Sequence, residues 1–329
     1  MLHLILSNGR FKGETMSRDP ALPISVVWSP DYEVDIGPHV FPTRKYRRVK
    51  ERLLAEGVLT EASFLAPAPA SEEDLARVHS DTYLEKIRRG SFSAAEERIL
   101  ELPFSAELRT ASVLCAGGTT MTARIALEDG ASVHLGGGFH HAFTGHGEGF
   151  CLLNDVAVAA RTLHAGGGVK RTLIVDLDVH HGNGTAEIFR DDPTVFTFSM
   201  HEERNYPVVK PPGDLDLGLD RGTGDAAYLG LLERHLQKVL DAHEFDLLLY
   251  LAGADPYEGD QLGGLGLSKE GLRRRDAEVL GQARMRGVPV AVVLAGGYAF
   301  DEEDTVEIHR NTVIEAIRAR SARHHERNA

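Results

Sequence analysis

Short apolar runs alternate along the chain with longer amphipathic stretches. The apolar runs are rich in β-branched residues and nearly continuous in hydrophobicity, which is typical of strands buried on both faces of a sheet. They predict strands at 24–28, 132–135, 172–177, 194–200, 246–253 and 288–297. The stretches between them predict helices at 44–56, 71–88, 106–128, 153–164, 225–242, 268–286 and 302–320. This alternation predicts an α/β fold with a mostly parallel central β-sheet that helices cover on both faces.

The ends of several predicted helices carry their own signals. Ser71 and Ser268 stand at helix starts, where a hydroxyl can accept a hydrogen bond from a free backbone N–H, so both are expected N-caps. Gly57, Gly130 and Gly287 are expected to stop helices at their C-terminal ends.

The chain is expected to form one domain. No linker divides residues 23–320. Glycines and prolines interrupt any regular pattern in the lead-in at 1–22, which we expect to be loosely ordered. Residues 321–329 are polar and are expected to be frayed.

The net charge indicates which kinds of partner the protein can bind, and the cysteine content indicates its cellular compartment. Lys and Arg number 36 against 49 Asp and Glu, a net charge of −13 that disfavours direct nucleic-acid binding and suits cationic partners such as lysine-bearing peptides or amines. Cys115 and Cys151 are too few for a disulfide framework, which is typical of a reducing cytoplasm. No apolar run reaches the ~20 residues of a membrane span, and residues 1–6 are too short for the core of a signal peptide. We therefore expect a cytoplasmic protein.

Polar side chains follow four of the predicted strands, at the carboxyl ends where ligands bind in an open parallel sheet. They are His140 and His141 after 132–135, Asp176, Asp178, His180, His181 and Asn183 at the end of 172–177, Asp255 after 246–253, and Tyr298 after 288–297. A core would not use these residues, so we expect them to converge on one rim of the sheet.

The carboxylates and one histidine of this set predict a metal site. Residues two apart in a strand share a face, so Asp176, Asp178 and His180 are expected to point the same way. One Asp and one His of this run can bind a metal, and Asp255 can supply a third ligand from a neighbouring strand. Three protein ligands with an open fourth position are the pattern of catalytic zinc. One nitrogen and two oxygens also suit Fe²⁺, Mn²⁺ or Co²⁺. Turn capping is the alternative role, but it leaves Asp255 and the paired histidines unexplained.

The remaining side chains suit proton transfer near such a metal. His140 and His141 are candidate acids and bases, and Asp176 and Asn183 can fix their tautomers from behind. Tyr298 could simply pack in the core, but at this rim its hydroxyl could stabilise an oxyanion. The residues therefore predict a metal-dependent hydrolase that acts on a carbonyl group.

Five motifs in order along the chain resemble the histone deacetylase family, which has the arginase–deacetylase fold. They are GGGFHHA (136–142), GFCLLND (149–155), VDLDVHHGNGT (175–185), AGADPYEGDQLGGL (252–265) and LAGGY (294–298). The resemblance extends from about residue 23 to residue 320. The segments 71–84, 115–127, 205–207 and 258–265 look most like the class IV branch, and a bacterial member is compatible with them.

The resemblance implies roles for the polar set. Asp178, His180 and Asp255 match the family's zinc ligands. His140 and His141 match its tandem histidines, the second as the main proton shuttle and the first as mainly electrostatic. Asp176 matches the carboxylate behind the first histidine, and Tyr298 matches the tyrosine that polarises the scissile carbonyl together with the metal.

The resemblance also implies a substrate channel and a second ion. Gly149, Phe150 and Tyr206 match the channel walls around the acyl-lysine stem, and Leu262 matches a gatekeeper at the rim. Backbone oxygens of Asp176, Asp178 and His180, with Ser199 and Met200, match a structural K⁺ site.

Two positions depart from the common pattern. Asn183 stands where class I members carry Asp, and a neutral amide stabilises an imidazolium less than a carboxylate does. Tyr206 replaces a phenylalanine of the channel wall and adds a hydroxyl without an assigned partner. Neither change removes a metal ligand, so we expect activity to survive.

The function that these observations imply is zinc-dependent removal of acyl groups, acetyl or long-chain fatty acyl, from the ε-amine of lysine in proteins or peptides. An acetylpolyamine amidohydrolase is an alternative, although Leu262 offers no acidic group to select a distant ammonium. An arginase-like enzyme with two Mn²⁺ ions needs more carboxylates than this set provides. A protein that binds acyl-lysine or scaffolds a complex without turnover is the alternative of another class.

Overall fold

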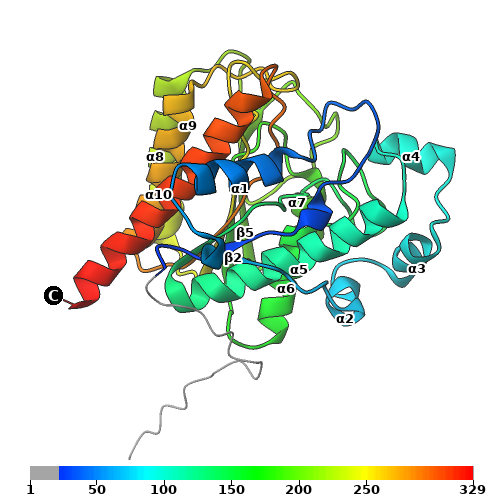
Figure 1. Cartoon of the computed structure of the whole chain (residues 1–329), viewed down its shortest axis with the longest axis horizontal. Helices are drawn as coiled ribbons and strands as arrows, with labels where there is room; N and C mark the ends of the chain where they lie inside the picture. The colour runs from blue at the N-terminus through cyan, green and yellow to red at the C-terminus, as the bar shows by residue number, and fades with distance from the viewer. Residues whose placement is uncertain (1–21, 329) are drawn as a thin grey trace, which may run out of the picture.

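The computed structural model describes residues 22–328, with side chains described as far as Arg320. An eight-stranded sheet forms its centre, in the order β2-β1-β3-β8-β7-β4-β5-β6, and all neighbouring strands are parallel (Figure 1). The strands are β1 (Val26–Val27), β2 (Phe64–Leu65), β3 (Ala131–His134), β4 (Thr172–Asp176), β5 (Val195–Glu202), β6 (Leu215–Leu219), β7 (Leu247–Leu251) and β8 (Val290–Val293). The predicted α/β fold with a parallel sheet is confirmed.

The six predicted strands are present, and two edge strands were missed. β2 is only two residues long. In β6, partly exposed and exposed positions alternate up to the buried Leu219, because one of its faces is open to solvent. An edge strand of this kind lacks the continuous apolar run that marks strands buried on both faces. The sequence pattern therefore predicts the central strands of the sheet better than its two edge strands.

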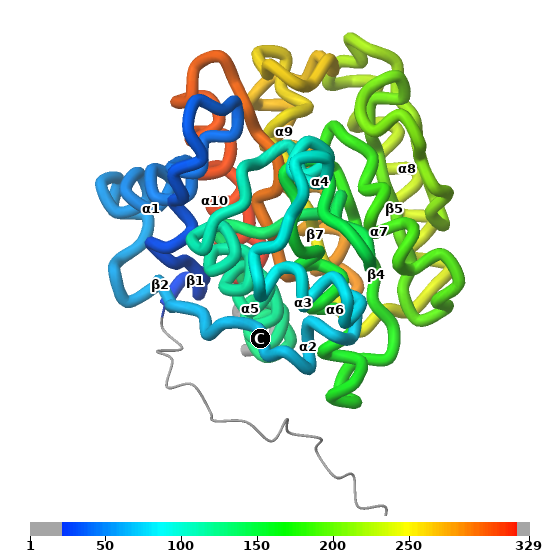
Figure 2. Tube along the Cα trace, turned by 90° about the vertical axis from the view of Figure 1, so that its right-hand side faces the viewer, coloured from blue at the N-terminus to red at the C-terminus, as the bar shows by residue number. Residues whose placement is uncertain are grey.

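Helices cover both faces of the sheet. They are α1 (Lys45–Ala55), α2 (Glu72–Ala76), α3 (Asp81–Arg89), α4 (Ala94–Leu100), α5 (Ala106–Asp129), α6 (Asp155–Ala165), α7 (Asn183–Phe189), α8 (Asp225–Ala242), α9 (Lys269–Met285) and α10 (Glu302–Asn328), with 3-10 turns at Pro30–Tyr32 and Glu61–Ser63. In β7, Leu248 and Tyr250 pack in the core beneath α1, α8, α9 and α10, whereas Leu247 and Leu249 pack in the core beneath α2 to α6. Figure 2 looks onto the side formed by α2, α3 and α4.

The predicted helix at 71–88 is wrong in one respect, because it is two helices. α2 ends at Ala76, and Ser80 begins α3 by accepting a hydrogen bond from the backbone N–H of Tyr83. Ser80 is thus an N-cap inside an otherwise helical pattern. Ser71 and Ser268 accept the hydrogen bonds expected of N-caps, so both predictions are confirmed. The short helices α4 and α7 were not predicted.

The last helix is longer than expected. The helix predicted at 302–320 continues to Asn328, so the segment expected to be frayed is helical from 321 to 328, and residue 329 lies outside the described residues. No glycine or proline follows Arg320, and so no residue in this segment breaks the helix. The lead-in at 1–22 falls outside the described residues except for Leu22.

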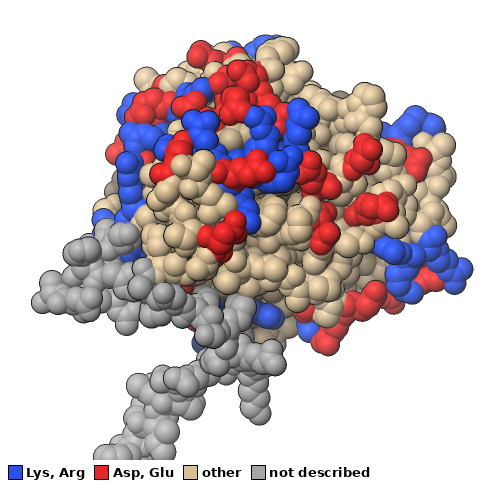
Figure 3. Space-filling model, viewed as in Figure 1, with Lys and Arg blue, Asp and Glu red and all other residues tan. Residues whose placement is uncertain are grey.

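The outer surface of α1 and α10 carries charges of both signs. Lys and Arg lie among Asp and Glu over these helices on the face shown in Figure 3. The two helices are joined by ion pairs, among them Arg44–Glu302, Arg48–Glu303 and Arg310–Glu56. That face therefore lacks the continuous basic surface that binds a nucleic-acid backbone. Among the described residues, no helix combines the length and the apolarity that crossing a bilayer requires.

Candidate active site

The carboxyl ends of the four central strands meet at one cavity, as the sequence predicts. β4 leads into Asp178 and His180, β7 into Asp255, β3 into the paired histidines, and β8 into Tyr298. The cavity has a volume of about 170 Å³. Nine of the predicted site residues line it: His140, His141, Gly149, Phe150, Asp178, His180, Tyr206, Leu262 and Tyr298. The structure therefore brings residues from across the sequence into one hollow.

Asp178, His180 and Asp255 form a group that can hold a metal ion. Their ligand atoms lie within 4.8 Å of one another, and all three side chains are buried. His180 Nδ1 is 3.0 Å from Asp178 Oδ1 and 3.4 Å from Asp255 Oδ2. Asp255 Oδ2 is buried without a hydrogen-bond partner among the described residues, although its Oδ1 accepts from the backbone N–H of Val179. A buried carboxylate oxygen left without a donor fits a bound cation.

The electrostatics of this group point the same way. Burial, together with the charge of Asp178, raises the pKa of Asp255 to about 7. Burial lowers the pKa of His180, but hydrogen bonds and charge from Asp178 and Asp255 outweigh it and raise that pKa to about 10. Two carboxylates this close need a positive charge between them. One nitrogen and two oxygens, with cavity space beside them, fit a divalent metal with an open coordination position.

Gly296 leaves room for these ligands. Its N–H donates to Asp178 Oδ2 at 2.8 Å. A Cβ at this position would come within 1.9 Å of Asp255 Oδ2 and 2.5 Å of Asp178 Oδ2. Glycine is thus required where the segment after β8 passes the carboxylates, because any side chain would displace them.

Each of the paired histidines is held from behind. His140 Nδ1 donates to Asp176 Oδ2 at 2.7 Å, and His141 Nδ1 donates to Asn183 Oδ1 at the same distance. The two Nε2 atoms are 3.1 Å apart. Burial lowers the pKa of His140, but Asp176 and Asp178 outweigh it and raise that pKa to about 9, because their charges favour the imidazolium.

The pKa of the second histidine, His141, shifts in the opposite direction to that of His140. Burial, and then the neighbouring His140 and His180, hold the pKa of His141 well below its usual range. Because Asn183 Oδ1 accepts a hydrogen bond from the Nδ1–H group of His141, the lone pair of a neutral His141 is on Nε2. A neutral imidazole with its lone pair on Nε2 can act as a general base, and in this structure His140 Nε2 lies 3.1 Å from that atom.

Tyr298 lines the cavity with its backbone firmly held. Its side chain is 9% exposed, and its ring contacts those of Phe41 and Phe150 edge to face. Its N–H donates to Asp260 Oδ2 at 2.7 Å. Burial and the charges of Asp178 and Asp255 raise the pKa of its hydroxyl well above the usual value, so the phenol stays protonated and can donate a hydrogen bond.

The predicted channel residues stand around the cavity. Gly149 has a φ of 51°, and a Cβ there would lie 2.9 Å from both His141 Cδ2 and Tyr206 Cε1, so a side chain would close the passage. The Tyr206 ring packs edge to face on His141, with centroids 4.9 Å apart. The Tyr206 hydroxyl, which had no assigned partner, donates to Glu148 Oε1 at 2.8 Å.

Sequence reasoning missed several residues that support the site. Lys45 is fully buried; burial lowers its pKa to about 8, and its Nζ donates to Ala295 O at 2.8 Å beside the Tyr298 ring. Arg275 donates to the carbonyls of Leu177 and Gly253, next to the loops that carry the candidate metal ligands. Both lie on amphipathic helices, where a basic residue normally marks a solvated face, so the sequence carried no signal of their role.

The residues of the predicted K⁺ site lie close together. Asp176 in β4 is the register partner of Ser199 in β5, and Met200 follows it, fully buried. Ser199 Oγ is 2.9 Å from His201 Nδ1. The K⁺ site stays a prediction.

The fold and this site define an arginase–deacetylase fold protein with a candidate metal centre at its strand ends. A crystal structure of an HDAC homolog complexed with SAHA is similar to it, with a TM-score of 0.75, 25% identity, and coverage of 89% of this chain and 84% of that one. The crystal structure of the HDA15 HD domain shares the fold, with a TM-score of 0.72, 24% identity, and coverage of 89% and 90%.

The chain belongs to the histone deacetylase family, since the family's histone deacetylase domain matches residues 39–313. Its relatives include an uncharacterized protein of Picosynechococcus sp., 45% identical over 86% of this chain and 95% of the relative. Histone deacetylase 2 of Arabidopsis thaliana is 32% identical over 85% and 76%, and a probable deacetylase of Methanothermobacter thermautotrophicus is 30% identical over 83% and 85%. The predicted family and fold are therefore confirmed.

Proposed function

We propose that the protein is a zinc-dependent amidohydrolase that removes acyl groups from the ε-amine of lysine in proteins or peptides. The observation that carries this proposal is the group Asp178, His180 and Asp255, with His141 and Tyr298 lining the same cavity and the Nδ1 of His141 held by Asn183. Bound zinc would supply a Lewis acid that polarises the carbonyl and makes water more acidic.

The chain's own residues supply the proton transfers and the positioning. His141 Nε2 takes a proton from the attacking water and gives it to the leaving amine when the C–N bond breaks. The Tyr298 hydroxyl donates to the oxygen that becomes negative in the tetrahedral state, where the hydrogen bond is stronger than in the ground state. Asp176 fixes the ring of His140 and keeps a positive charge near the reaction. The walls formed by Phe150 and Tyr206 exclude water from the acyl-lysine stem.

The finer features belong to the same proposal. Resemblance supports a class IV assignment, the placement of Asp176 opposite Ser199 supports a structural K⁺ ion, and the two free, buried cysteines suit a cytoplasmic location.

An acetylpolyamine amidohydrolase is the second candidate, and one observation favours it. Glu101 lines the cavity, although Leu262 at the rim carries no charge. Burial raises the pKa of Glu101, but an exposed part of the side chain can still attract a distant ammonium group.

The test is a rate comparison across acetyl-, octanoyl- and myristoyl-lysine peptides and acetylated polyamines, using zinc-loaded protein, chelated protein and chelated protein with zinc restored. We expect turnover of acyl-lysine peptides that chelation abolishes and zinc restores. Faster turnover of the polyamines would favour the second candidate. Peptide binding without any turnover would identify a binding protein and overturn the proposal.

A further inference from the structure

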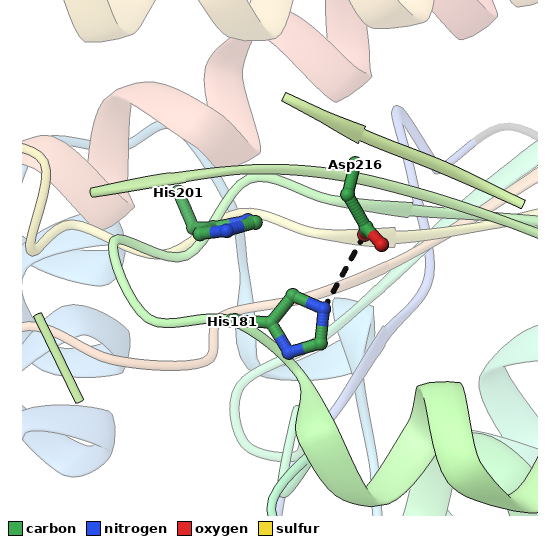
Figure 4. Close-up of side chains that lie close together, drawn as sticks. All are labelled: His181, His201 and Asp216. Atoms are coloured by element: carbon green, nitrogen blue, oxygen red, sulfur yellow. Dashed lines mark ion pairs between the residues drawn. The ribbon is translucent and has the colours of Figure 1, made fainter. Parts of the chain in front are cut away.

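A second group of metal-ligating side chains lies outside the candidate active site. Among the described residues, His181, His201 and Asp216 place one ligand atom each within 4.8 Å of one another (Figure 4). They come from three segments: the loop after β4, strand β5 and edge strand β6. Neither the resemblance nor the reaction proposed above gives them a role.

The three side chains are placed as ligands of one ion would be. His181 Nε2 lies 3.3 Å from Asp216 Oδ1, and the rings of His181 and His201 meet edge to face with centroids 4.7 Å apart. His181 is 1% exposed and His201 2%, whereas the Asp216 side chain is 28% exposed. Among the described residues, His181 Nδ1 has no hydrogen-bond partner, so the protein holds this buried ring through Nε2 alone.

Burial and charge favour a cation at this group. His181 and His201 are both buried, so water competes little for their ring nitrogens. Asp216 supplies the negative charge. A small cavity of about 10 Å³, which His181, Ser199 and Asp216 help to line, lies alongside. A space of this size holds one water molecule or one small ion.

We propose that His181, His201 and Asp216 bind a first-row divalent transition cation such as Zn²⁺ or Co²⁺, separately from the candidate active-site metal. Two imidazoles and a carboxylate are the donor set that these ions prefer, whereas K⁺ takes oxygen ligands. The partial exposure of Asp216 leaves a position for water. The ion would tie the loop that carries His180 to β5 and to the edge strand β6, and would thereby stabilise this side of the sheet.

The test counts metal in metal-free protein reloaded with Co²⁺ in buffer that contains K⁺, by elemental analysis after desalting. We expect two equivalents in the parent and one in Asp216→Asn, which keeps the shape of the side chain. His201→Gln should also bind one equivalent fewer. His164→Gln is the matched control, because His164 contacts Thr172 and Thr194 near the opposite ends of β4 and β5. Its count should equal that of the parent.

Differences between variants exclude metal bound by the histidines at 324 and 325, which all variants share. Thermal unfolding gives a second measure. Co²⁺ should raise the Tm of the single variant Asp255→Ala by more than it raises the Tm of the double variant that carries Asp255→Ala and Asp216→Asn. Equal counts in the parent, Asp216→Asn and His201→Gln would overturn the proposal.

An independent observation concerns Glu148, at the edge of the candidate active site. Glu148 Oε1 accepts from Asn183 Nδ2 at 2.8 Å and from the Tyr206 hydroxyl at 2.8 Å, and Oε2 lies 3.3 Å from His146 Nε2. Its side chain is 20% exposed. Burial raises the pKa of Glu148, but hydrogen bonds from His146, Tyr206 and Asn183 outweigh it, so the carboxylate stays charged.

The position of the Glu148 carboxylate affects how Asn183, which stands where class I members carry Asp, holds His141. The Asn183 amide donates to Glu148 through Nδ2, so its Oδ1 must face His141, from which it accepts at 2.7 Å. A flipped amide would place an oxygen against the carboxylate and an NH₂ group against the N–H of His141. Hydrogen bonds in a chain also strengthen one another, so charge on Glu148 makes Oδ1 a better acceptor.

We infer that Glu148 is a positioning residue: it fixes the Asn183 amide and supplies, one hydrogen bond further back, the negative charge that an aspartate at position 183 would supply directly. This inference rests on the proposed function for its kinetic consequences. Its structural part, which is the orientation of Asn183 and the tautomer of His141, does not depend on the proposed function.

The kinetic test compares Glu148→Gln in two backgrounds. In the parent, kcat for an acyl-lysine peptide should fall about 10-fold or more, as for other residues that orient a ligand or base from behind. In Asn183→Asp, the same substitution should leave kcat unchanged or raise it, because it removes a repulsive pair of carboxylates. His146→Gln changes the contact at Oε2 and keeps both hydrogen bonds at Oε1, so it should lower kcat less than Glu148→Gln does. An equal loss in both backgrounds would contradict the inference.

The second test needs no turnover. NMR of ¹⁵N-labelled histidine should show His141 as the Nδ1–H tautomer in the parent and a shift toward mixed tautomers in Glu148→Gln. An unchanged His141 spectrum would overturn the inference even if the protein were inactive. Absence of turnover in the parent with a shifted spectrum would reject the proposed function alone.

Discussion

At the scale of single residues, Tyr298 has two separable parts. Its ring packs against Phe41 and Phe150, and the Nζ of the buried Lys45 lies 5.4 Å from the ring centroid. Tyr298 and His180 both line the cavity, and their ring centroids are 6.5 Å apart. Phenylalanine would preserve all of the ring contacts, so the hydroxyl can be removed alone.

Tyr298→Phe should lower kcat by about 10²–10³-fold, the usual effect of losing one oxyanion donor. KM should change little, because the ground-state carbonyl needs this donor less than the tetrahedral state does. Steady-state kinetics and a melting curve check this. A lowered Tm with parental kcat would instead identify Tyr298 as a packing residue.

At the scale of elements, parallel strands bring distant ligands together. β4 and β7 are direct neighbours in the sheet, with Asp176 opposite Leu251, so the loops that follow them carry Asp178, His180 and Asp255 to the same edge. Arg275 of α9 donates to the carbonyls of Leu177 and Gly253 and holds both loops in place. The strand order therefore creates the ligand group.

Asp255→Ala should remove one equivalent of zinc per chain and with it the activity, because Asp178 and His180 alone leave the ion too weakly held. Elemental analysis of the desalted protein measures the loss. Asp246→Asn is the control, since Asp246 lies before the other end of β7 and accepts from the N–H groups of Lys170 and Arg171. Unchanged zinc content in Asp255→Ala would assign the metal to other ligands.

At the scale of the whole molecule, buried neutral histidines couple folding to pH. His79 is 2% exposed, donates from Nδ1 to Phe143 O at 3.0 Å, and accepts at Nε2 from the N–H of Asn154 at 3.1 Å. Burial lowers the pKa of His79 to about 4, against about 6.5 in an unfolded chain. Between these values the unfolded state binds the proton and the folded state does not, so the free energy of unfolding falls as the pH falls.

The contribution of His79 to this slope should approach about 1.4 kcal/mol per pH unit. Urea unfolding between pH 6.5 and 5 should therefore give a steeper loss of stability in the parent than in His79→Gln. The variant should be less stable at pH 7, because its hydrogen bonds are poorer, yet approach the parent as the pH falls. Parallel slopes for the two proteins would show that His79 does not titrate on unfolding.

Much of the fold was predictable, because local patterns carry it. Strands buried on both faces produce continuous apolar runs, and the six predicted strands form the whole sheet apart from its two edge strands, β2 and β6. The break at Ser80 and the strand β6 escaped notice. A capping serine inside a helical pattern looks like an ordinary residue of one continuous helix. An edge strand with alternating exposure lacks the apolar run by which the other strands were predicted.

The sequence by itself determined the alternation of strands and helices and the residues at the strand ends, because periodicity and turn residues act over a few neighbouring positions. Only the tertiary structure decided that Lys45 and Arg275 support the site, that Glu148 stands behind Asn183, and that β6 brings Asp216 to His181. These contacts join segments far apart in the chain. Strand order, helix packing and the exclusion of water select them, and no local pattern of residues records that selection.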